Sequence, residues 1–195
     1  MIIYQQVEYV QSKNLGYNKD NIIHFDKEGL VQQNTENFLA ELKKLPGVVN
    51  ASAIQQSVVV EGGGSSTYGI SWPGKIENNN IDFNVRPVDF DMIETLGIQI
   101  KEGRSFSRQY GDEKSKLIFN ETAVKIMGLK NPIGTPIRMW GEDMTIVGVV
   151  RDFHMSSMHE AIAPMVFKYD PEQTMMIMAR IAAGKEQETL GLMEK

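Results

Sequence analysis

The chain of 195 residues has no cysteine, no long hydrophobic run and no surplus of positive charge. Without cysteine, the sequence excludes disulfide frameworks, thiolate catalysis and metal sites with cysteine ligands. No apolar run approaches the roughly 18–20 residues that a helix needs to cross a bilayer, and the start lacks the basic region and apolar stretch of a secretion signal. A net charge of −5 argues against a nucleic-acid partner, because proteins that bind nucleic acids carry a basic surplus.

The sequence does contain enough apolar material for a folded core, with 42% hydrophobic and 23% charged residues. Its length suits one large domain or two small ones. Both ends read as helices that continue further: residues 3–10 have helical apolar spacing, and residues 186–195 place Leu190 and Met193 on one helical face. We therefore expect an excised part of a longer protein whose membrane segments lie outside it.

The first third of the chain predicts a strand–helix–strand unit of the βαβ kind. Residues 22–25 form a short apolar strand, and a helix capped by Asn34 or Thr35 carries apolar residues at helical spacing. A Pro-Gly pair at 46–47 ends this helix, and residues 48–54 read as the second strand.

A Gly/Ser-rich break at residues 61–66 follows, and after it short strands alternate with short helices. We expect Asp89 to cap a helix that ends at Gly97, and Asn120 to cap one that ends at Gly128. The further expected elements are a hairpin of residues 136–140 and 144–150, strands at 165–169 and 175–181, and a helix from residue 186. The order predicts an α+β (mixed α/β) fold: βαβ, an inserted mixed module, then βαβ again.

The segment 146–159 carries the strongest candidate for chemistry. An apolar strand runs into a polar stretch with Asp152, His154 and His159. These could bind a metal ion, but zinc takes three or four ligands, Glu160 is the only further one nearby, and no H-E-x-x-H spacing is present. A soluble metal-dependent hydrolase that uses the three residues is the enzymatic alternative. The favoured interpretation is that they hydrogen-bond the turn after a core strand.

Two other patterns complete no catalytic motif. Ser156 and Ser157 lie beside His154, but no G-x-S-x-G elbow surrounds them. The glycine run at 62–64 has no following lysine that would make it a P-loop. We therefore predict that this chain is not an enzyme, with no catalytic residue, no metal and no cofactor.

Four phrases, in matching order and spacing, resemble the periplasmic core domain of MacB/FtsX-type ABC transporter permeases. They are residues 9–23, residues 90–97 with 103–107 (Gly-Arg-Ser-Phe-Ser), residues 119–123 with 128–134 (ending Asn-Pro-Ile-Gly), and residues 146–159 with Pro164. The motif residues to which the resemblance gives a structural role are Gly103, Arg104, Asn120, Glu121, Asn131, Pro132, Gly134, Gly148, Asp152, Phe153, His154, His159 and Pro164.

The resemblance implies a particular domain organisation. A stalk helix (residues 1–17) would continue from the first transmembrane helix. A porter-like subdomain of two βαβ units (18–60 and 144–195) would be split by an inserted, mixed α/β, Sabre-like subdomain (61–143).

The resemblance also implies a function outside the cytoplasm. The fragment would be the periplasmic part of an inner-membrane permease that transmits ATP-driven motion across the membrane (mechanotransmission) to export or handle a substrate. Implied partners are a cytoplasmic ATP-binding subunit, which would carry the ATPase activity, a second permease in a dimer, and a periplasmic adaptor or substrate protein. A docking module for a periplasmic partner protein is a further alternative.

Overall fold

The computed structural model describes residues 21–56, 65–76, 80–154 and 161–193. The predicted stalk helix, His159 and most of the Gly/Ser-rich break lie outside these ranges. In chain order the elements are β1 (Ile22–Asp26), α1 (Gly29–Gln33), α2 (Thr35–Leu42), β2 (Val48–Ile54), β3 (Ser65–Thr67), β4 (Ile70–Ser71), β5 (Phe83–Val88), α3 (Met92–Leu96), β6 (Ile100–Gly103), the 3-10 helix η1 (Arg108–Tyr110), β7 (Lys116–Asn120), α4 (Glu121–Met127), β8 (Pro136–Met139), β9 (Glu142–Val150), β10 (Met165–Tyr169), the 3-10 helix η2 (Pro171–Gln173), β11 (Met176–Ile181) and α5 (Glu186–Met193).

The strands of the described residues form one mixed sheet, in the order β1-β11-β2-β5-β10-β7-β9-β8-β4. Off this path, β3 pairs with β5 and β6 pairs with β9. The β5–β10 and β7–β9 pairs are parallel, and the others are antiparallel. The predicted α+β class is confirmed. Among the described residues, no helix is long and apolar enough to span a bilayer.

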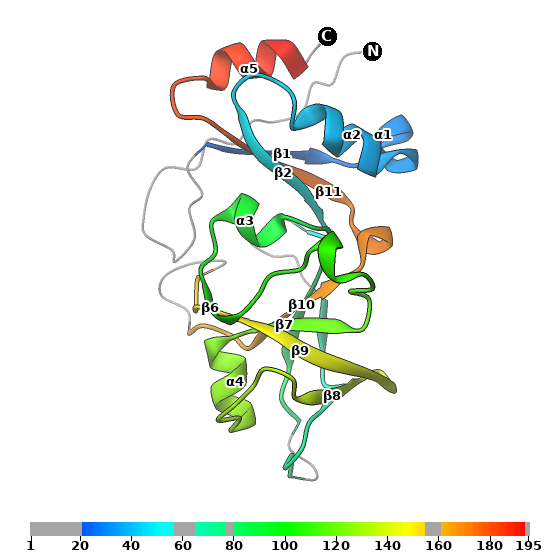
Figure 1. Cartoon of the computed structure of the whole chain (residues 1–195), viewed down its shortest axis with the longest axis vertical. Helices are drawn as coiled ribbons and strands as arrows, with labels where there is room; N and C mark the ends of the chain where they lie inside the picture. Colours follow the sequence, from blue (N-terminus) through cyan, green and yellow to red (C-terminus); the bar gives the residue numbers. More distant parts are fainter. Residues whose placement is uncertain (1–20, 57–64, 77–79, 155–160, 194–195) are drawn as a thin grey trace.

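One end of the molecule, here called the first unit, consists of β1, β11 and β2 with α1, α2 and α5 (Figure 1). Both β1 and β2 run antiparallel to β11, which lies between them, so they are parallel to each other. Small and branched residues such as Ala51 and Ile177 alternate toward one face of these strands, where they meet Leu39 and Leu42 of α2 and the half-buried Leu190 of α5. The alternation thus buries one face of the first unit under its helices.

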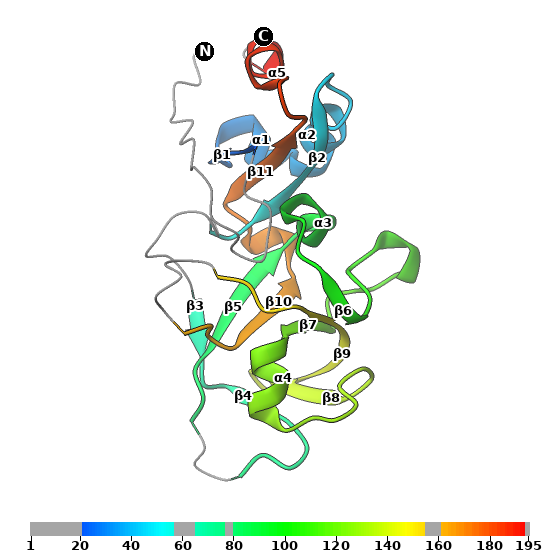
Figure 2. The ribbon, with the colours of Figure 1, turned by 90° about the vertical axis from the view of Figure 1, so that its left-hand side faces the viewer.

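The other end, the second unit, consists of β3 to β10 with α4 (Figures 1 and 2). Ala123 and Met127 of α4 pack on a core that includes Phe83 and Phe119, whose rings meet edge-on at 6.1 Å. The opposite face of the sheet carries a different core cluster, to which Ile118 and Phe167 belong.

The two units meet at a narrow place in the sheet, the waist. There β2 and β5 share a single bridging pair, Ile54 and Val88, flanked by backbone hydrogen bonds from Gln55 to Pro87 and from Asp89 to Ala53, at 3.0 and 2.8 Å. Helix α3 follows β5 in sequence but packs on β2 and β11 of the first unit. Its residues join one buried cluster that contains Ile22 and Met178 of the first unit together with Phe167 and Ile118 of the second. The core therefore runs across the waist.

Two local predictions need correction. Asp89 does not cap α3: the capping position is Asp91, whose φ is +67° and whose side chain makes no capping hydrogen bond. The strand at 144–150, expected to open the second βαβ unit, pairs with β6, β7 and β8 of the second unit. The subdomain boundaries themselves stay a prediction.

Candidate functional site

Asp152, the acidic member of the predicted cluster, holds the start of α4. Its two carboxylate oxygens accept hydrogen bonds from the backbone N–H and the hydroxyl of Thr122, at 2.9 and 2.8 Å. Its own N–H donates to the Glu121 carboxylate at 3.0 Å. The carboxylate satisfies one of the N–H groups that the first turn of a helix leaves unpaired, and the helix dipole attracts it. Asp152 thus joins the end of β9 to α4.

Glu121 belongs to the same cluster of contacts. The Lys101 ammonium lies 2.7 Å from its carboxylate. That hydrogen bond, followed by the one from the Asp152 N–H, lowers the pKa of the Glu121 carboxyl. The motif carboxylates of this region are therefore engaged with helix and strand ends.

The histidines do not complete a metal site in the described residues. His154 is half-buried and follows Phe153, whose ring stacks on Phe167 at 6.2 Å in the core. His159 lies outside the described residues. Within the ranges that the structure describes, no three His, Cys, Asp or Glu side chains group so as to hold a metal ion.

Asn120, another predicted motif residue, bonds to α4 and to the chain that enters β10. As predicted, its side-chain oxygen caps α4 by accepting from the Ala123 N–H, at 3.0 Å. The same oxygen accepts from the Met165 N–H at 2.9 Å, and the amide nitrogen donates to the Ala163 carbonyl at 3.0 Å. Pro164, between them, accepts from the Asn84 N–H at 2.9 Å. One buried amide thus fixes α4 and the entry to β10 together.

Gly103 and Gly148 oppose each other where β6 pairs with β9. A Cβ atom at Gly103 would stand 2.2 Å from the Val147 carbonyl oxygen, and one at Gly148 would stand 2.2 Å from the Arg104 carbonyl oxygen. Gly103 also has a φ of +74°, a region that residues with a Cβ rarely adopt. Both motif glycines are required by close backbone approach.

Arg104 is paired with a buried carboxylate that the sequence did not single out. Its guanidinium contacts both oxygens of Glu113, at 2.5 and 3.2 Å, and the Glu113 side chain is fully buried. The Ser107 N–H also donates to Glu113, at 3.1 Å, and the Tyr110 ring lies against the guanidinium at 3.8 Å. These contacts close residues 104–113 into a compact loop.

The Asn-Pro-Ile-Gly motif forms a turn against β9. The Gly134 N–H, at a φ of +83°, donates to the Ile146 carbonyl at 2.8 Å. Thr135 returns two hydrogen bonds to the turn, from its N–H to the Pro132 carbonyl at 3.1 Å and from its hydroxyl to the Asn131 carbonyl at 3.2 Å. This motif, like the others, connects structural elements within the second unit.

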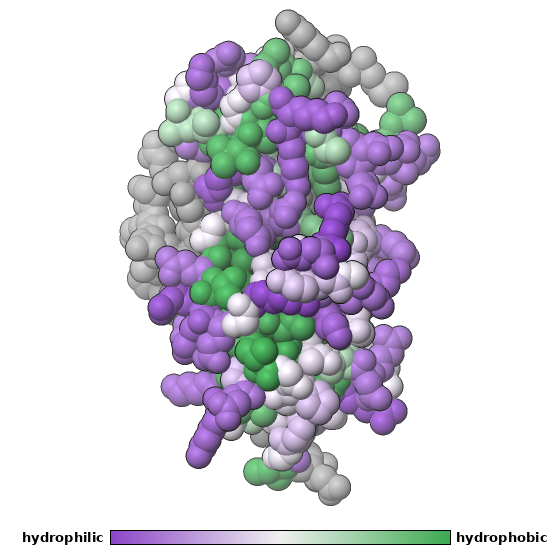
Figure 3. Space-filling view, in the orientation of Figure 1, coloured by the Kyte–Doolittle hydropathy of each residue, from purple (hydrophilic) through white to green (hydrophobic). Residues whose placement is uncertain are grey.

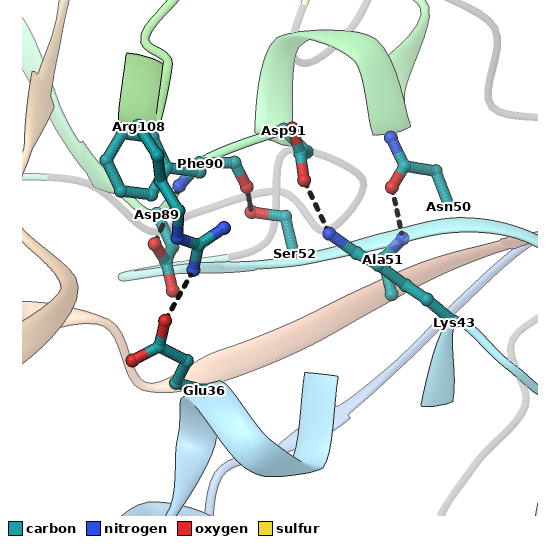
Figure 4. A network of polar contacts seen from close by, with 9 residues as sticks. All are labelled: Glu36, Lys43, Asn50, Ala51, Ser52, Asp89, Phe90, Asp91 and Arg108. Atoms are coloured by element: carbon teal, nitrogen blue, oxygen red, sulfur yellow. Dashed lines mark hydrogen bonds and ion pairs between the residues drawn. The ribbon is translucent and has the colours of Figure 1, made fainter. Parts of the chain in front are cut away.

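A polar group at the waist was missed by the sequence reasoning (Figure 4). Lys43, just after α2, pairs with Asp91 at 2.5 Å. The Ser52 hydroxyl of β2 donates to the Phe90 carbonyl at 2.6 Å, and the Phe90 ring stacks on Tyr169 at 4.2 Å. Each contact joins residues about 40 or more positions apart, so no local pattern could have revealed the group.

Asp89 lies buried in the same place. Its carboxylate accepts from the Phe90 N–H at 2.7 Å. Burial raises the pKa of Asp89, although that hydrogen bond and the cations Arg108 and Lys43 act in the opposite direction. Burial, with the negative charge of Asp89 adding to it, raises the pKa of Tyr169 to about 12. The waist therefore combines buried polar groups, Ser52 and Asp89, with the partly exposed Lys43–Asp91 pair. The face of the molecule in Figure 3 is mostly hydrophilic, with hydrophobic residues gathered in smaller areas.

Comparison with known proteins agrees with this architecture. A family model, the MacB-like periplasmic core domain, matches residues 3–191. The periplasmic region of MacB from Actinobacillus actinomycetemcomitans has a TM-score of 0.57 at 15% sequence identity, covering 93% of this chain and 86% of that chain. The extracellular domain of the noncanonic ABC-type transporter YknZ from Gram-positive bacteria has a TM-score of 0.55 at 15% identity, covering 87% of this chain and 88% of that chain. No curated protein sequence matches the chain.

At this identity the two solved structures establish the shared fold, and the family model, which spans nearly the whole chain, establishes membership. The family is one of transporter parts without catalytic activity in this domain, and it implies an ATP-binding subunit as a partner. The chain belongs to the MacB-like periplasmic core domain family, the periplasmic or extracellular domain of MacB/FtsX-type ABC transporter permeases.

Proposed function

We propose that this domain transmits ATP-driven motion from the cytoplasmic side of the membrane to a substrate or partner protein in the periplasm. The observation that carries the proposal is the continuity of the molecule. A single sheet and one buried cluster extend from the first unit across the waist into the second. Because packed cores are stiff, a displacement applied to the first unit reaches the second.

The position of the first and last described elements supports this role. The start of β1 and helix α5 lie at the same end of the molecule (Figure 1). The Ile181 N–H at the end of β11 donates to the Asn21 carbonyl at 2.8 Å, and Thr189 of α5 donates to the Pro46 carbonyl at 3.1 Å. In permeases of this family, membrane helices adjoin the periplasmic domain on both sides. Movement of either helix would then act on the first unit.

In this proposal the first unit is the porter-like part and the second contains the inserted, Sabre-like part. The stalk helix at residues 1–17 would act as the lever, because a helix carries axial displacement better than coil does. The domain would work as part of a permease dimer in the inner membrane, with an adaptor or substrate protein as its periplasmic partner.

The test uses the complete transporter. Deletion of residues 1–17, or insertion of two glycines after Asp20, should leave ATP hydrolysis in place while transport is lost. The same insertion after Gly74, where a Cβ would meet no atom within 4 Å, is the matched control and should retain transport. Normal transport after the insertion at Asp20 would disprove transmission through the stalk.

A further inference from the structure

We propose that residues 104–115, here called the clasp, form a releasable latch that sets the angle between the first and second units. The clasp follows β6, contacts α2 of the first unit through Arg108 and leads into β7 of the second unit. The contacts of the clasp support the latch itself. Only the use that the transporter would make of it rests on the proposed transmission of motion.

The base of the clasp is rigid. The Arg104–Glu113 pair, with Glu113 fully buried, closes the loop. Phe106 is buried in the core cluster that crosses the waist, and its ring lies 6.2 Å from that of Tyr169. The Ser107 hydroxyl accepts from the Gln109 N–H at the start of η1. A loop held in this way presents its tip in one geometry, with little freedom left to lose on making a contact.

Two ion pairs, one at the tip of the clasp and one where the clasp returns to β7, contact the first unit and the chain that leads into it. Arg108 pairs with Glu36 of α2 at 3.0 Å (Figure 4), and its guanidinium lies over the Phe90 ring at 4.7 Å. Lys114 pairs with Glu172 of η2, in the connection from β10 to β11, at 3.3 Å. The clasp therefore bridges the waist at two points outside the sheet.

These two bridging ion pairs are weak because their side chains are exposed to solvent. The side chains of Arg108 and Glu36 are 55% and 77% exposed, and those of Lys114 and Glu172 are 65% and 80% exposed. Exposed ion pairs shift an equilibrium only roughly two- to five-fold each and are screened by salt. A rigid arm with weak tip contacts can release without unfolding of its base. The buried core that crosses the waist would keep the two units joined, and because β2 and β5 share only one bridging pair there, release would change only the angle between the units.

The experiment measures the distance between the units. Because the chain has no cysteine, Leu30→Cys in α1 and Ile126→Cys in α4, both exposed, can carry spin labels for pulsed electron paramagnetic resonance. Glu36→Ala removes the ion pair alone, and Arg108→Ala removes both the pair and the contact with Phe90. The charge-swapped Glu36→Arg/Arg108→Glu variant restores a pair. Glu41→Ala breaks an equally exposed pair with Lys44 inside the first unit and is the matched control.

We expect a narrow distance distribution for the parent and for Glu41→Ala. Glu36→Ala and Arg108→Ala should increase the population at other distances roughly two- to five-fold, the charge swap should reverse this, and about 1 M salt should imitate Glu36→Ala. Circular dichroism checks that each variant is folded. If Arg108→Ala does not fold, Glu36→Ala, at its exposed site, still tests the latch. Unchanged distributions in folded Glu36→Ala and Arg108→Ala would overturn the latch. Because this measurement involves no transport, its failure is distinct from failure of the stalk experiment.

Discussion

Gly148 lies directly under the carbonyl oxygen of Arg104, where an added Cβ atom would stand 2.2 Å away. The close approach lets the chain turn from β6 into the clasp while β9 stays paired beside it. The two atoms nearest to the added Cβ are the carbonyl oxygen and carbon of Arg104. Both belong to the backbone, so they cannot move aside as the end of a flexible side chain could.

Gly148→Ala should therefore lower the free energy of unfolding, by about 2–4 kcal/mol. Urea denaturation followed by circular dichroism measures this. Gly191→Ala in α5, where no atom lies within 4 Å of the added Cβ, is the control and should be neutral or stabilising by up to about 1 kcal/mol. Equal stability of the two variants would contradict the close approach.

Asn120→Ala should destabilise the second unit because three backbone groups lose their partner at once: the buried N–H groups of Ala123 and Met165 and the part-buried carbonyl of Ala163. We expect a loss of about 2–4 kcal/mol in the free energy of unfolding. Asn131→Ala, at an exposed motif position, should cost less than about 0.5 kcal/mol. A small effect at Asn120 would mean that α4 and β10 are held by other contacts.

Glu113→Ala should leave the Arg104 guanidinium facing a buried space without its counter-ion. The expected loss is about 2–4 kcal/mol of unfolding free energy, because removal of one partner of a buried pair leaves an uncompensated charge. The melting temperature measures it, with exposed Glu142→Ala as the control that should not change. Hydrogen exchange of the clasp amides, from Ser105 to Lys114, should increase in Glu113→Ala and stay at the parent rate in Glu142→Ala.

Asp89→Asn should stabilise the protein at neutral pH. Burial raises the pKa of Asp89 in the folded state above the value of about 3.9 in an unfolded chain. A group of this kind favours the folded state fully below that pH, and the contribution is lost as the pH rises through the folded-state pKa. The amide does not ionise, so the melting temperature at pH 7 should rise by roughly 1–3 °C, and the gain should shrink toward pH 4.

The control for this titration is Asp143→Asn, at an exposed position in the β8–β9 hairpin, which should leave the pH profile unchanged. A lower melting temperature of Asp89→Asn at pH 7 would show that attraction to Arg108 and Lys43 outweighs the cost of burial.

Zinc should have no stoichiometric site on this chain. Both carboxylate oxygens of Asp152 already accept hydrogen bonds from Thr122, so a metal ion there would compete with the α4 contact. Isothermal titration with zinc should show no binding of one ion per chain, and a chelator should leave the melting temperature unchanged. His154→Ala should give the same results as the parent. A one-to-one zinc isotherm that disappears in His154→Ala would revive the hydrolase alternative.

Local chemistry accounts for the parts of the fold that could be read from the sequence. Residues 48–54 and 165–169 form strands because both are short, mainly apolar segments with few polar residues. Asn120 and Gly128 bound α4 because a short side-chain acceptor and a residue tolerant of positive φ are what helix ends need. The family phrases within the described residues form caps, tight turns and close backbone approaches.

Only the tertiary structure decided which of these elements meet. The strand at 144–150 pairs with the second unit, and α3 packs on the first, because long-range packing chose the partners. The burial of Asp89, the pairing of Arg104 with Glu113 and the reach of Arg108 to Glu36 depend on residues between 9 and 72 positions apart. The sequence determined the strands, the caps and the family, since those depend on neighbours in the chain. The waist and its clasp exist only once the two units have packed together.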